Sequence, residues 1–193
     1  GAPRFLMDNV ALLQSHIHSL VLETIQVKLP PRPREVLDLE APGYPLYPDL
    51  AEEFQGKIAL HRSAILEAVR DAFAEERAQF SWLTADLIAQ IVSGFVDALD
   101  ATFNAWRTEY GQLLQEVQEI HDRLVHQHAN VGLAQRYKVI AQKLEEMREG
   151  KDDFYTYRYL GSQGFLPNYA FPRKSATVTF YENEETLSRD PVL

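Results

Sequence analysis

A run of apolar residues in the middle of the chain recurs at steps of three and four positions. This seam consists of Ile88, Val92, Phe95, Leu99, Phe103, Trp106, Tyr110, Leu113, Val117, Ile120 and Leu124. The spacing puts these residues on one helix face, and it lasts for more than five heptads, nearly as in a coiled coil. Thr84 stands where a helix N-cap belongs. Gly94 and Gly111 each weaken a helix by about 1 kcal/mol relative to alanine, which packing outweighs. We predict one long helix from Thr84 to residues 130–132, with any bend at a glycine.

Three further stretches have helical spacing. Asp8 or Asn9 is positioned to cap the first of them, and Gly150 to end the last. The three stretches are residues 10–29, 49–80 and 133–148. The first part of the chain, residues 1–150, is therefore predicted to be a helical bundle domain.

Six of the ten prolines lie in residues 30–48, between the first two predicted helices. Proline lacks a backbone N–H group and fixes φ, so this segment is predicted to be an extended connector. Its interspersed apolar residues indicate that it packs against a surface of the bundle. These residues are Val36, Leu37, Leu39, Tyr44, Leu46 and Tyr47.

Residues 151–193 are rich in aromatic side chains and end in a strand pattern, ATVTFY, over residues 176–181. A lone strand leaves both of its edges unpaired. We therefore interpret residues 151–193 as an aromatic loop and a short β-strand that begin a further domain, cut off here. The expected fold class is mostly α: a helical bundle built on one long helix, with an aromatic C-terminal loop and a short β-strand.

The net charge of −9 is spread unevenly. Residues 1–34 carry +2 and residues 151–193 carry −1, whereas residues 35–150 carry −10. An acidic middle repels a phosphate backbone, so nucleic-acid contacts are expected near the two ends. Cysteine is absent, which excludes disulfides and thiolate sites and fits a reducing cytoplasm. No apolar stretch reaches membrane-spanning length. We expect a cytoplasmic protein without a membrane partner.

The sequence contains no P-loop, no GxGxxG, no HExxH and no GxSxG motif. The pairs His16/His18 and His126/His128 are each two residues apart, which points them to different faces of a helix, so no metal site is predicted. No catalytic residue and no cofactor site is predicted either. The aromatic run near the C-terminus permits two readings, a stacking platform for single-stranded nucleic acid or a small core beneath the loop. We favour the core. The run comprises Phe154, Tyr155, Tyr157, Tyr159, Phe165, Tyr169 and Phe171.

Two stretches carry a resemblance to a known family. RFLMDNVALLQSHIHSLVLE (residues 4–23) resembles the segment that follows the second motor domain in large bacterial DEAD/DEAH-type superfamily-two helicases. GFLPNYAFPR (residues 164–173), a strand and LSRDP (residues 187–191) resemble a later stretch of the same proteins. These helicases, of the phage-defence and DNA-repair type, carry a C-terminal domain of unknown function. The matches cover about fifty residues and bracket a helical middle that resembles nothing we know.

The resemblance implies a non-catalytic accessory fragment of an ATP-dependent nucleic-acid helicase, which braces the motor or guides nucleic acid. Its partners would be the motor and C-terminal domains of the parent protein, together with DNA. The family's ATP-binding motifs are missing here, so ATP and Mg²⁺ are expected only in the parent's motor domains. The expected nucleic-acid contacts are Arg4, Arg32, Arg34, Arg158, Tyr169, Arg173 and Lys174. The alternative is a helical scaffold that self-associates through its seam, and the sequence leaves the oligomeric state open.

Overall fold

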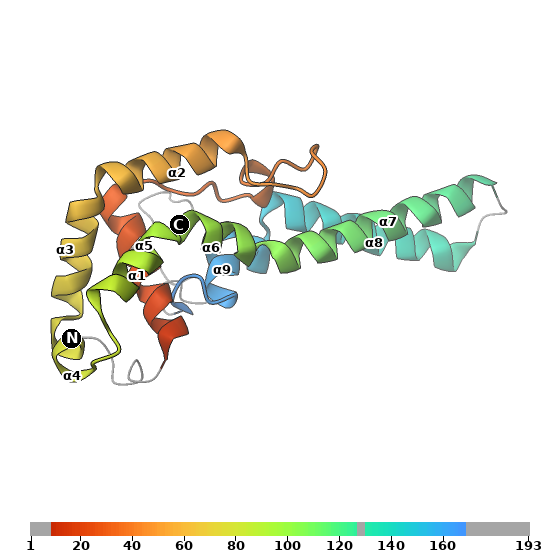
Figure 1. Ribbon diagram of the computed structural model, residues 1–193. Helices are drawn as coiled ribbons and strands as arrows, with labels where there is room; N and C mark the ends of the chain where they lie inside the picture. The colour runs from red at the N-terminus through yellow and green to blue at the C-terminus, as the bar shows by residue number, and fades with distance from the viewer. Residues whose placement is uncertain (1–8, 127–129, 169–193) are drawn as a thin grey trace.

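The structure is a computed structural model, and it describes residues 9–126 and 130–168. The described chain is mostly helical, which confirms the predicted fold class of a helical bundle. Figure 1 shows a bundle of packed helices from which one hairpin, α7 with α8, extends away. The helices are α1 (Val10–Ile25), α2 (Pro48–Leu60), α3 (Arg62–Ala72), α4 (Ala74–Gln79), α5 (Ala85–Ser93), α6 (Phe95–Thr102), α7 (Asn104–His126), α8 (Val131–Glu149) and α9 (Thr156–Ser162), with short 3₁₀ turns η2 (Pro33–Glu35) and η3 (Asp152–Phe154).

The prediction of one long helix after Thr84 is wrong in its continuity. Thr84 caps α5, but the helix is interrupted at Gly94 and again at Phe103, whose ψ angles are 8° and 0°. Gly111 lies within α7 without interrupting it. The interruptions let each piece pack on a different partner: α5 on α1 and α3, α6 on α2, and α7 on α8. A straight helix through all three would extend roughly 60 Å and would leave the bundle.

The helix predicted over residues 49–80 is also divided. It consists of α2, α3 and α4, separated at His61 and Phe73, whose backbones have ψ angles of 17° and 27°. These values lie in the bridge region, where a helical turn opens. Phe73 is almost fully buried, and Figure 1 shows the chain turning around the bundle from α2 into α3. The turn from α2 into α3 lies at His61, whereas the break between α3 and α4 lies where the aromatic side chain of Phe73 enters the core.

The first helix begins and ends at specific side-chain and backbone contacts. Asn9 caps α1, accepting a hydrogen bond from the N–H of Leu12 at 3.0 Å. The helix ends at Ile25, earlier than predicted, because Gln26 is left-handed with φ of 55°. Leu29 is nevertheless buried, and its N–H donates to the Tyr157 hydroxyl at 2.5 Å. This hydrogen bond fixes the non-helical segment that follows α1 to the segment that contains Tyr157.

The proline-rich connector packs on the bundle, as predicted. Val36 and Leu37 are fully buried, and Leu37 forms an isolated antiparallel bridge with Leu46. Two backbone hydrogen bonds close this bridge, from Asp38 N–H to the Pro45 carbonyl and from Tyr47 N–H to the Val36 carbonyl. The predicted strand over residues 176–181 lies outside the described residues.

The seam is covered within one chain. Nine of its eleven members belong to the buried core, and Leu113 and Leu124 pack partly buried against that core. A seam that is already buried offers no free apolar face to a second copy. The observation that suggested self-association therefore no longer favours it.

The aromatic segment after Gly150 is partly helical, which corrects the prediction of a loop. It contains η3 and α9, and it is continuous with the same core as the helices before it. Tyr157, Tyr159 and Phe165 are buried, with at most 7% of each side chain exposed. A buried ring has no face for a nucleic-acid base, so for these three residues the core reading holds. Tyr169 and Phe171 lie outside the described residues.

Phe165 joins this segment to α1 through His18. The two rings stack with centroids 4.1 Å apart, and Phe95 meets both rings edge-on. His18 Nδ1 lies 2.9 Å from the Phe165 carbonyl oxygen, which can only accept, so Nδ1 carries the proton and donates. Burial lowers the pKa of His18 to about 4, although the hydrogen bond to Phe165 opposes the shift. His18 is therefore neutral at pH 7.

A neutral buried histidine makes stability depend on pH. Its pKa is about 4 when folded and 6.5 when unfolded, so the unfolded chain takes up a proton first as the pH falls. The contribution of His18 is full above pH 6.5 and is lost progressively toward pH 4, by about 3 kcal/mol. In His18→Asn, which keeps a donor near the Nδ1 position, the free energy of unfolding should fall less steeply over this range.

The measurement is urea unfolding of the wild type and His18→Asn between pH 7 and pH 4. The stability difference between the two proteins should shrink as the pH falls. His126→Asn, at an exposed position, is the control and should follow the wild type. Parallel curves for the wild type and His18→Asn would contradict the assignment.

Candidate functional site

The hairpin of α7 and α8, which we call the arm, projects from the bundle. Its two helices run antiparallel, and Figure 1 shows its far part extending from the bundle. A buried stripe between the two helices holds them together. The stripe comprises Tyr110, Val117, Ile120, Ile140, Leu144 and Met147.

Two ion pairs cross the arm and mark its register. Arg136 makes a two-pronged contact to Glu116, with N–O distances of 3.0 and 3.1 Å. Lys143 Nζ lies 2.9 Å from Glu109 Oε2. From the first pair to the second, the position on α8 rises by as many residues as the position on α7 falls. An antiparallel pairing without a break in register requires this. Exposed pairs of this kind add little stability, so their effect is to fix which residues face each other.

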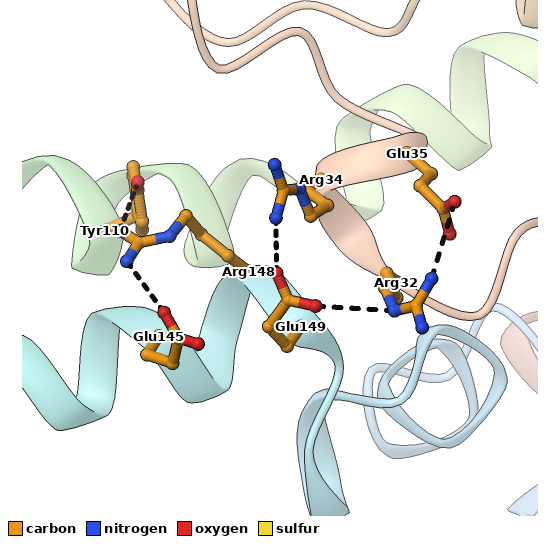
Figure 2. Close-up of polar contacts among 7 residues, drawn as sticks. All are labelled: Arg32, Arg34, Glu35, Tyr110, Glu145, Arg148 and Glu149. Atoms are coloured by element: carbon orange, nitrogen blue, oxygen red, sulfur yellow. Dashed lines mark hydrogen bonds and ion pairs between the residues drawn. The ribbon is translucent and has the colours of Figure 1, made fainter.

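The base of the arm is tied to the connector by Glu149, the last residue of α8 (Figure 2). Arg34 donates to Glu149 Oε2 at 2.5 Å, and Arg32 Nε lies 3.4 Å from Glu149 Oε1. Arg32 also contacts Glu35 at 3.7 Å. The hydrogen bond from Arg34 lowers the pKa of Glu149 and raises the pKa of Arg34. We call Arg32, Arg34 and Glu149 the base cluster.

A second contact at the base joins the arm's two helices. Arg148 donates to the Tyr110 hydroxyl at 3.1 Å and to Glu145 at 3.3 Å (Figure 2). The Tyr110 ring itself is buried, stacked on Trp106 with centroids 4.8 Å apart. The end of α8 is thus fixed both to α7 and to the connector.

Gly150 brings the chain closest to the connector. It has φ of +71°, and a Cβ placed on it would lie 2.6 Å from the Pro31 carbonyl oxygen. The same oxygen accepts a hydrogen bond from the N–H of Thr156 at 3.0 Å. The base of the arm therefore depends on a residue without a side chain at this position.

The structure brings two of the predicted nucleic-acid contacts together and leaves a third apart. Arg32 and Arg34 meet at Glu149, so an acidic partner offsets their charge. The side chain of Arg158, on α9, is half-buried and forms no ion pair within residues 9–126 and 130–168. The remaining predicted contacts, Arg4, Tyr169, Arg173 and Lys174, lie outside the described residues.

Glu149, Arg148 and Tyr110 were not predicted as site residues. Glu149 is 115 residues from Arg34, and no motif in the sequence relates the two. Charge alone marked Arg32 and Arg34, whereas their partner becomes apparent only when α8 docks on the connector. The sequence signal for Glu149 was a carboxylate directly before the C-cap glycine Gly150. That pattern is too common to identify a site residue.

The described residues give no sign of a metal centre or a membrane span. Across residues 9–126 and 130–168, no three His, Asp or Glu side chains gather in a way that would hold a metal ion. In the same part of the chain, no helix combines the length and the apolar character that crossing a membrane requires.

The far end of the arm exposes branched aliphatic side chains. Val125 near the end of α7 and Val131 at the start of α8 are 61% and 80% exposed. They belong to the two helix ends that residues 127–129 connect, so both lie at the tip. Single exposed aliphatic side chains are common on protein surfaces, so these two valines mark the tip only as the apolar part of the arm that a partner could reach.

Gly150→Ala should destabilise the protein, because alanine is strained at φ of +71° and its Cβ would meet the Pro31 carbonyl. The expected loss is about 1–3 kcal/mol in the free energy of unfolding. Gly56→Ala is the matched control, since nothing lies within 4 Å of its Cβ position in α2. It should stabilise the helix by about 0.5–1 kcal/mol. Urea unfolding measures both, and equal effects would contradict the close approach at Gly150.

Ile140→Ala should cost about 2–5 kcal/mol, because Ile140 is buried in the stripe of the arm. The neighbouring Val139 is 59% exposed, so Val139→Ala should change stability by no more than about 0.5 kcal/mol. Thermal unfolding followed by circular dichroism compares the two. Similar losses would mean that α8 does not pair with α7 in this register.

Comparisons of this chain with protein-family models, with curated proteins and with solved structures found no match. Its function must therefore be inferred from its own residues.

Proposed function

We propose that this chain is a non-catalytic accessory domain of an ATP-dependent nucleic-acid helicase, and that it braces the motor through its arm. The arm is the observation that carries the proposal. Its buried stripe packs α7 against α8, its cross-arm ion pairs fix the register, and the base cluster links it to the connector. A projection of this kind is suited to holding a second domain at a set distance.

The resemblance of residues 4–23 and 164–173 to helicase segments supports the motor as the partner. The two stretches meet in space, since His18 of the first contacts Phe165 of the second. Within this domain, the two stretches therefore pack against each other in the bundle. This leaves the arm as the part of the domain that is free to reach a neighbour.

The charges of the described residues favour bracing over guiding a strand. Arg32 and Arg34 are paired with Glu149, and residues 35–150 carry −10. Phosphate binding would have to replace these ion pairs and overcome the acidic surroundings. Guidance of a strand would then rest on Arg158 and on Arg4, Arg173 and Lys174.

The test uses the full-length parent protein that the resemblance implies, with its motor present. Val125→Ser combined with Val131→Ser should weaken the coupling of the arm to the motor, because it removes the exposed apolar tip. We expect DNA-stimulated ATP hydrolysis to fall by about tenfold, as for the loss of a small contact centre. Leu60→Ser is the control, since Leu60 is 74% exposed on the bundle, away from the arm.

A companion titration separates bracing from guidance. Fluorescence anisotropy of labelled single-stranded and duplex DNA should detect no binding by the present chain at moderate salt. Salt-sensitive binding that Arg173→Glu with Lys174→Glu abolishes would favour guidance instead. Wild-type coupling in the tip variant would overturn bracing, and ATP hydrolysis by this chain alone would overturn the accessory assignment.

A further inference from the structure

Glu76 is a carboxylate that is buried among apolar side chains of the bundle. It lies on the short helix α4, and only 8% of it is exposed. Its neighbour Glu75, on the same helix, is exposed to solvent. Acidic side chains are almost never buried to this extent unless they are paired.

Glu76 has no such partner among the described residues. Its Oε1 atom is shielded from solvent and receives no hydrogen bond. No lysine, arginine or histidine in residues 9–126 or 130–168 lies within ion-pair distance of it. A buried carboxylate without a donor is costly, so it points to a group that binds there.

The walls around Glu76 are aromatic. It lines a closed crevice, with no room for a water molecule, together with Leu13, Phe73, Phe80, Trp82 and Leu83. Phe80 and Trp82 stack on each other with centroids 6.1 Å apart, and both are half-buried. They belong to the non-helical connection between α4 and α5. The outer wall of the crevice is thus a pair of rings on a segment that no helix holds.

We propose that this crevice binds a guanidinium group. The group is planar, it pairs with a carboxylate through two parallel hydrogen bonds, and it stacks on aromatic faces. Glu76 supplies the carboxylate, and Phe80 and Trp82 supply the faces. The crevice is too narrow for a water molecule as it stands, so binding moves the Phe80–Trp82 wall outward.

The guanidinium has two possible sources. One is Arg4 of the same chain, five residues before Asn9, which caps the helix that contains Leu13 of the crevice. Five residues span at most about 17 Å, so Arg4 is within reach of the crevice. The other source is an arginine side chain of another molecule. This site is separate from the arm and does not depend on the function proposed above.

Methylguanidinium chloride is the probe, titrated at constant ionic strength into the wild type and into Arg4→Gln. Tryptophan emission reports the result, because Trp82 lines the crevice whereas Trp106 is buried at the base of the arm. If another molecule supplies the guanidinium, the wild type shows a saturable change. If Arg4 supplies it, the wild type shows none and Arg4→Gln shows a saturable change. Either result supports the site.

The matched variants are Glu76→Gln and Glu75→Gln, each made in whichever protein responds. Glu76→Gln should weaken binding at least tenfold, whereas Glu75→Gln should leave it unchanged, since Glu75 faces solvent. Phe80→Leu, which keeps an apolar wall without a π face, should weaken binding too and serves if Glu76→Gln fails to fold. No saturable change in either the wild type or Arg4→Gln overturns the proposal. Equal losses in Glu75→Gln and Glu76→Gln also overturn it.

Discussion

The contact between His18 and Phe165 joins residues that are 147 positions apart, and the rest of the bundle is arranged around it. His18 lies on α1, the helix that also packs against α2, α3 and α5. Phe165 follows α9, whose own start is held by the carbonyl of Pro31. The contact fixes α9 to α1, and the hydrogen bond from the Thr156 N–H to the Pro31 carbonyl joins α9 to the connector, against which the chain packs at Gly150. The base of the arm is therefore linked to this contact through α9 and the connector.

Sequence spacing predicted which residues are buried better than it predicted where helices break. Nine seam residues are buried and their helical phase was right, because burial of one face is what the spacing records. The interruptions at His61, Phe73 and Phe103 carry no local signal, since none of these residues is a strong helix breaker. Each occurs where the chain must change its packing partner. The positions of these breaks depend on tertiary packing, which the spacing of apolar residues in the sequence does not record.

The candidate site was predictable in part for the same reason. The apolar residues of the connector correctly predicted that it packs on the bundle. Asn9 and Thr84 were recognisable as N-caps, because a cap depends on local sequence. Arg32 and Arg34 were recognisable as cations, but Glu149 as their shared partner was not. A cation next to prolines looks available for phosphate in sequence. In the fold, Arg32 and Arg34 instead form ion pairs with Glu149, which offset part of their positive charge.

The interruption at Phe103 gives the arm a mechanical property. With 23 residues, α7 is roughly 35 Å long, so a rotation of about 10° at this point displaces the tip by about 6 Å. Such a rotation would have to open both the ion pairs of Glu149 and the packing at the base, where Trp106 stacks on Tyr110 and Gly150 lies against Pro31. Exposed ion pairs add little stability, so the packing contributes most to holding the arm. A small loss of packing at the base would therefore be seen as a much larger displacement at the tip.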